Sequence, residues 1–123
     1  MLKGASMQIE THEMGDLLLL KPMDNRLDAS SANALRGTVV DRVNMGHRCI
    51  VLDLANVDFI DSSGLAAVIS CSKALGSQGS MVVCNAKDKV RHIFELTRMK
   101  QIFSICETWE EAVKALGLPS EAG

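Results

Sequence analysis

The residues best suited to chemistry stand together in one short segment, Asp61-Ser62-Ser63-Gly64-Leu65. The segment follows an apolar run over residues 49–54 and precedes apolar residues at helical spacing, which places it where a strand and its loop meet a helix. A serine at such a junction can cap the helix, with Gly64 allowing a close approach or tight curvature. A serine there can also be a phosphorylation site, because a helix N-terminus favours negative charge.

A phosphoserine in this segment would act on binding more than on folding. Phosphorylation adds about −1.5 to −2 charges. The helix N-terminus stabilises negative charge by roughly 0.3–1 kcal/mol at an exposed site, and the nearby Asp61 opposes it. Burying the unpaired dianion in a partner interface would cost several kcal/mol. At about 1.4 kcal/mol per tenfold, affinity would fall by more than a hundredfold. The segment is therefore suited to a binding switch that leaves the fold intact.

Enzyme motifs are missing from the chain. The pattern Gly-x-Ser-x-Gly of a hydrolase nucleophile fails, since a glycine stands only after the second serine. No glycine-rich phosphate loop occurs. Asp53, Asp58 and Asp61 are expected to be loop and cap carboxylates, without the partners that a metal site needs. Three histidines are expected at the surface, not as catalytic bases: His12, His47 and His92. We expect no catalysis, no metal and no cofactor.

Composition narrows the class of protein further. A length of 123 residues predicts one domain, and 3% aromatic residues leave an aliphatic core without rings for stacking bases. The net charge of −2 offers no basic footprint, so no direct contact with nucleic acid is expected. No apolar run approaches the roughly 20 residues of a membrane span, and a cytoplasmic location is expected. Four widely spaced cysteines are expected to be structural free thiols: Cys49, Cys71, Cys84 and Cys106.

Hydrophobic periodicity predicts strands and helices in the order β-β-α-β-α-β-α-β-α. The expected strands cover residues 7–11, 16–22, 49–54, 80–84 and 102–105. The expected helices begin after Asp28 or Ser30, near Ser63, at residue 88 and after Thr108, and the third runs to residue 100. Residues 23–27 and 55–60 are expected as loops. This alternation predicts an α/β fold, with a mixed, mostly parallel sheet of about five strands and about four helices. The domain is expected at residues 7–117, between a disordered tail or expression remnant over 1–6 and a C-terminal tail over 118–123.

The run Ile50-Val51-Leu52-Asp53-Leu54, followed by Val57 and then by residues 59–65, resembles the STAS domain family. More closely, it is similar to the stand-alone bacterial anti-sigma factor antagonists, or anti-anti-sigma factors. Upstream, Arg26-Leu27-Asp28-Ala29 fits the family segment before the first helix. Downstream, residues 81–83, Val90 and residues 108–112 fit later elements. The resemblance covers about residues 7–117, and Asn25 stands where many members have glycine.

The resemblance implies a partner switch without enzymatic activity. In the family, a serine kinase of the histidine-kinase-like ATPase class is also the anti-sigma factor, and it phosphorylates the second serine of the motif, here Ser63. The unphosphorylated protein binds this kinase and frees the sigma factor, the phosphorylated protein lets go, and a PP2C-type phosphatase resets it. The implied binding surface comprises Asp28, Asp61, Ser62, Ser63, Gly64 and Leu65, with Ser62 as the expected helix cap. The alternatives are a non-switching accessory subunit of a phospholipid ABC transport or stressosome-type complex and, third, a small enzyme using Asp61 and Ser63.

Overall fold

The computed structural model describes residues 8–15, 17–76 and 79–116. The expected tails, residues 1–6 and 118–123, lie outside these ranges. Within them, no helix combines the length and the apolar character needed to cross a membrane.

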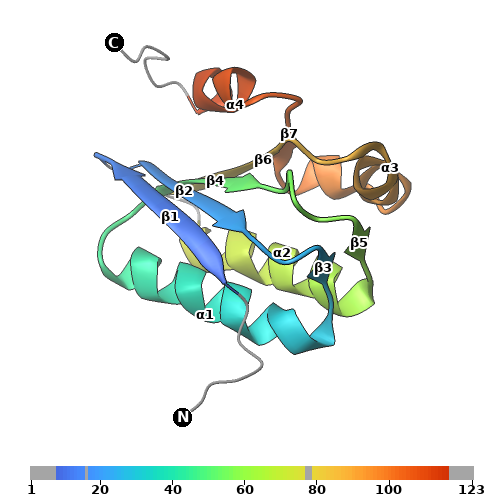
Figure 1. The fold of residues 1–123 in the computed structure, drawn as a ribbon. Helices are drawn as coiled ribbons and strands as arrows, with labels where there is room; N and C mark the ends of the chain where they lie inside the picture. The colour runs from blue at the N-terminus through green and yellow to red at the C-terminus, as the bar shows by residue number, and fades with distance from the viewer. Residues whose placement is uncertain (1–7, 16, 77–78, 117–123) are drawn as a thin grey trace.

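A five-stranded sheet forms the centre of the fold (Figure 1). Its strands run in the order β1-β2-β4-β6-β7, of which only β1 is antiparallel to its neighbour. The strands are β1 (Ile9–Met14), β2 (Leu17–Pro22), β4 (Cys49–Asp53), β6 (Ser80–Cys84) and β7 (Ser104–Ile105). The predicted mixed, mostly parallel sheet is confirmed.

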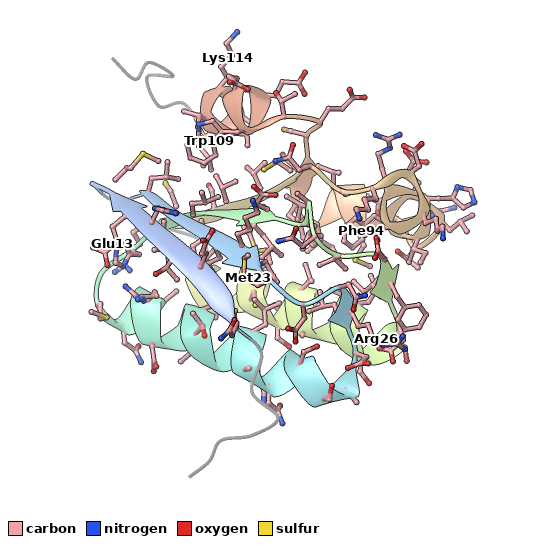
Figure 2. All side chains as sticks on the ribbon, in the orientation of Figure 1. Glu13, Met23, Arg26, Phe94, Trp109 and Lys114 are labelled. Atoms are coloured by element: carbon pink, nitrogen blue, oxygen red, sulfur yellow. The ribbon has the colours of Figure 1, made fainter. Side chains whose placement is uncertain are left out.

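Both faces of the sheet are covered. Alternate side chains of each central strand point to opposite faces, so each strand contributes to two cores. Leu18, Ile50 and Met81 are in register and belong to the larger core, whereas Val51 and Val82 belong to a smaller one. Three helices contribute to the larger core: α1 (Ala29–Asn44), α2 (Ser62–Leu75) and α3 (Asp88–Leu96). The fourth, α4 (Trp109–Ala115), covers the opposite face with the half-buried Trp109 (Figure 2). The four predicted helices are confirmed.

The expected loops at 23–27 and 55–60 each contain a short strand. These strands, β3 (Arg26–Leu27) and β5 (Phe59–Ile60), pair in parallel as a separate two-stranded sheet. The carbonyl oxygen of Asn25 accepts hydrogen bonds from the backbone N–H groups of Asp58 and Phe59 at 2.8 and 3.2 Å. Two residues per strand are too few for a periodic signal, so hydrophobic periodicity does not predict this pairing.

The predicted helix over residues 88–100 is too long. Helix α3 ends at Leu96, and Arg98 follows in the left-handed region with φ of +61°. A short 3₁₀ helix, η2 (Met99–Gln101), then leads into β7. The hydroxyl of Thr97 donates to the Ile93 carbonyl at 2.7 Å, and the Thr97 side chain is exposed.

Candidate functional site

The N-terminus of α2 is capped by Asp61. This residue has an extended backbone, and its Oδ1 accepts a hydrogen bond from the Gly64 N–H at 3.0 Å. The Asp61 carbonyl accepts from the Leu65 N–H at 2.9 Å, which closes the first turn. The prediction that Ser62 caps the helix is therefore wrong: Ser62 and Ser63 already belong to α2, and the carboxylate one residue earlier reaches the free N–H.

The two serines differ in exposure. Ser62 is exposed, whereas Ser63 is half-buried at a groove of about 240 Å³ between α1 and α2. Within the described ranges, neither hydroxyl makes a hydrogen bond. Ser63 therefore presents an unengaged hydroxyl that neither caps the helix nor supports the core.

A second acidic cap begins the neighbouring helix α1. The Asp28 Oδ1 accepts from the Ser30 N–H at 3.0 Å and from the Ser30 hydroxyl at 2.7 Å, while the Ser31 hydroxyl accepts from the Asp28 N–H at 3.0 Å. The Arg26 Nε donates to the Asp28 Oδ2 at 3.2 Å. Hydrogen bonds from Ser30 and then from Arg26 lower the pKa of the Asp28 carboxyl. Of the two caps that the sequence allows here, Asp28 is the one used.

The β3–β5 pair brings the two helix starts together. The Leu27 carbonyl in β3 accepts a hydrogen bond from the Asp61 N–H at 3.3 Å. In the same place a Cβ on Gly64 would lie only 2.1 Å from the Leu27 oxygen, so only glycine lets α2 approach β3 this closely. The sequence suggests a close approach at Gly64 but does not identify the backbone that it meets.

Arg26 and Phe59 form an exposed contact beside the two helix starts, and no sequence motif predicts it. The Arg26 guanidinium lies over the Phe59 ring, 4.5 Å from its centroid, and both side chains are exposed. Figure 2 shows Arg26 at the end of the molecule where β3 and β5 lie. The contact follows from the register of Arg26 opposite Phe59, which no sequence pattern displays.

The expected binding-surface residues fall into two groups. Asp28, Asp61, Ser62 and Ser63 stand at the starts of α1 and α2, and the first two are tied together through β3. Gly64 is buried and Leu65 is half-buried against the larger core. These last two set the position of the helix and offer little surface to a partner.

The remaining polar groups in the part of the chain that the structure describes form no reactive cluster. His12 and His92 are exposed as predicted, but His47 is only 8% exposed, and its Nδ1 lies 3.2 Å from the Arg42 carbonyl oxygen. The prediction of a surface histidine is wrong at this position because the turn after α1 folds the ring against the helix end. Asp53 is buried, and its Oδ1 accepts from the Ala55 N–H at 3.0 Å.

The described ranges contain no group of three histidine, cysteine or carboxylate residues that could hold a metal ion. Asp58 pairs with Lys87 instead of joining Asp53 and Asp61. Cys71, Cys84 and Cys106 are free thiols, as predicted. Burial raises the pKa of the Cys71 thiol and of the Cys84 thiol to about 12, which makes both unreactive at neutral pH.

The chain is similar in sequence and in fold to known proteins. The model of the STAS domain family matches residues 8–112. The chain is 33% identical over 101 residues to BtrV of Bordetella bronchiseptica, by its name a candidate anti-sigma factor antagonist, with 81% of this chain and 87% of the relative covered. It is 28% identical to the anti-sigma F factor antagonist of Paenibacillus polymyxa, covering 90% and 93%. The crystal structure of a candidate anti-sigma factor antagonist from Thermotoga maritima superposes with a TM-score of 0.80 at 27% identity, covering 89% and 94%.

Proposed function

Because this chain belongs to the STAS domain family, we propose that it is an anti-sigma factor antagonist in a partner-switching pathway. In its unphosphorylated form it binds a serine kinase of the histidine-kinase-like ATPase class that is also the anti-sigma factor, and this releases the sigma factor. Phosphorylation of Ser63 abolishes the binding, and a PP2C-type phosphatase restores it. The protein acts in the cytoplasm, through binding and not through catalysis of its own.

This proposal rests on the different roles of Asp61 and Ser63 at the start of α2. Asp61 supplies the cap of α2, so the Ser63 hydroxyl has no structural task that phosphorylation would destroy. A half-buried hydroxyl in the first turn of a helix lies where a kinase can reach it once the two proteins dock. The modification can then change the surface without unfolding the helix start.

The energetic effect falls on the interface with the partner. A surface that fits a neutral hydroxyl would have to bury a phosphate dianion that the partner does not neutralise, at a cost of several kcal/mol. A loss of about 2.8 kcal/mol already lowers affinity a hundredfold. The carboxylates of Asp28 and Asp61 stand at the same helix starts, and their negative charge repels a phosphate dianion.

The names of the two sequence relatives support the antagonist role. Both are named for antagonism of an anti-sigma factor, and each aligns over more than four-fifths of its own length with this chain. The partner that we propose is therefore an anti-sigma factor. We propose in addition that this partner is itself a serine kinase.

A labelling assay tests the site. The kinase that co-purifies with the chain is incubated with radiolabelled ATP and with wild type, Ser63→Ala or Ser62→Ala. We expect Ser62→Ala to be labelled like wild type and Ser63→Ala to remain unlabelled, since the two variants lose the same atom one residue apart. Labelling of Ser63→Ala as strong as that of wild type would show that the site is elsewhere.

A binding measurement tests the switch. Calorimetric titration of the kinase with Ser63→Asp is expected to show at least a tenfold weaker affinity than with wild type, while the far-UV circular dichroism stays the same. Equal affinities would contradict the charge mechanism. Co-purification of a transporter ATPase in place of a serine kinase would favour the accessory-subunit alternative.

A further inference from the structure

We infer that Arg36, on α1, binds the phosphate of phosphorylated Ser63 across the groove between α1 and α2. The modified protein would thus hold its own phosphate with a cation from the neighbouring helix. This inference rests on the proposed modification of Ser63 and adds to it the group that receives the phosphate.

The groove brings Arg36 and Ser63 to one place from two helices. Its α1 side is formed by Ala32, Asn33 and Arg36, and its α2 side includes Ser63 and Ser70. Alanines form the rest of the α2 side, so small side chains line much of this groove of about 240 Å³. The residues that line it include no carboxylate. Ala32 and Arg36 are one turn apart on the same face of α1, which aims both at α2. Among the described residues that line the groove, Arg36 is the only one with a formal charge, so a phosphate on Ser63 would enter a space with a positive charge.

Arg36 is available for a new partner. Its Nη2 donates to the Asn33 Oδ1 at 3.0 Å, a neutral acceptor one turn earlier. In the described ranges, no carboxylate lies within 4.0 Å of its guanidinium, whereas Arg26 and Arg42 each have a carboxylate partner. Recruiting Arg36 would exchange a neutral hydrogen bond for a charge-assisted one, and charge-assisted bonds are roughly twice as strong.

The positive charge of Arg36 already acts on α2. Burial raises the pKa of the Cys71 thiol to about 12, and Arg36 acts in the opposite direction on the same thiol. Cys71 follows Ser70 of the groove directly, two turns along α2 from Ser63. The guanidinium of a long, exposed side chain can turn from this position towards the start of α2.

The start of α2 cannot hold the phosphate well without help. The Gly64 N–H is already used by the Asp61 carboxylate, and that carboxylate repels a second anion. An arginine supplies a planar fork of N–H donors that matches two phosphate oxygens. A phosphoserine opposite arginine gains about one to three charge-assisted hydrogen bonds. Arg36 would therefore offset the repulsion from Asp61 and fix the phosphate on the surface that the partner contacts.

The test places phosphoserine at position 63 of the full chain during translation, so that no kinase is needed. A ³¹P NMR titration then gives the second pKa of the phosphate, which is ordinarily about 6. We expect this pKa to be lower with Arg36 than in Arg36→Gln by about half a unit or more, because a nearby cation favours the dianion. Arg36→Lys should give a value in between, and 0.5 M salt should shrink the difference.

Lys73→Gln is the matched control. It removes one positive charge from an exposed position on α2 itself, ten residues from Ser63 or about 15 Å along the helix. It should leave the phosphate pKa unchanged, and circular dichroism should show all variants folded. Equal values in wild type and Arg36→Gln, or equal shifts in Arg36→Gln and Lys73→Gln, would overturn the inference. A kinase that fails to label Ser63 would instead overturn the proposed function and leave this titration unaffected.

Discussion

Gly64→Ala is the sharpest test of how α2 is held against β3. A methyl group at this position would lie 2.1 Å from the Leu27 carbonyl oxygen and 2.8 Å from the Ile60 Cγ1. The nearest atom belongs to the backbone, so no side chain can swing aside to relieve the contact. The start of α2 and β3 must separate by roughly 1 Å, which also stretches the hydrogen bond from the Asp61 N–H to the same oxygen.

The cost follows from three contributions. Inserting a methyl group into a packed site costs about 1–3 kcal/mol. Weakening the Asp61 hydrogen bond adds up to about 1 kcal/mol, and the better helix propensity of alanine returns up to about 1 kcal/mol. We expect a net loss of about 2 kcal/mol, which for a domain of this size lowers the melting temperature by roughly 6–10 °C.

Urea unfolding, followed by far-UV circular dichroism and by the fluorescence of the single tryptophan, Trp109, measures this loss. Gly37→Ala is the matched control, because Gly37 lies in α1 and a Cβ there would meet nothing within 4 Å. That variant should gain about 0.5–1 kcal/mol from helix propensity. If Gly64→Ala is as stable as wild type, the tight contact between α2 and β3 is not a feature of the molecule in solution.

Three further outcomes are expected. Asp61→Ala should cost about 1 kcal/mol of unfolding free energy through loss of the cap while Asp61→Asn keeps most of it, as urea titration would show; equal losses would exclude the cap. Hydrogen bonds, chiefly from the Ser30 hydroxyl, lower the pKa of Asp28 below its ordinary 3.8. The ionised Asp28 therefore contributes fully to the stability of the fold above that value, and this contribution is lost as the pH falls through the lowered pKa. The difference in unfolding free energy between wild type and Asp28→Asn should consequently shrink below about pH 4. A constant difference from pH 2 to 6 would contradict this assignment. Cys71 and Cys84, with pKa values raised to about 12 by burial, should react with a thiol reagent at pH 8 only after unfolding; rapid reaction in the native protein would show that these sites open.

The central elements could be predicted because local patterns coincide with the tertiary arrangement. The β-branched run Cys49–Asp53 is buried on both faces, which is what a continuous apolar strand indicates. Thr108 caps α4 by accepting from the Glu111 N–H at 3.1 Å, as its spacing predicts. The end of α3 could not be read in this way. Its stop depends on a left-handed Arg98, a conformation for which the residue type gives no signal.

The site could be located but not assembled from sequence. The motif predicts Ser63 as the modified residue and places Asp61 beside it, yet the choice of cap depended on backbone dihedral angles that make Asp61 the extended residue. The link between Asp28 and Asp61 runs through two strands of two residues each. A pairing this short is decided by the packing of Leu27 and Ile60 in the core, so it appears only once the fold is formed.

The pairing of β3 with β5 also bears on how fast a partner can bind. The loops before α1 and α2 are fastened to each other by backbone hydrogen bonds and anchored by fully buried Leu27, so both helix starts form one rigid unit. A rigid surface loses little conformational entropy when it docks. Association would then be limited by diffusion and orientation, within about 10⁵–10⁷ M⁻¹s⁻¹, with no slow rearrangement. The proposed phosphate on Ser63 would then lower affinity mainly by shortening the lifetime of the complex, as changes within one interface usually do.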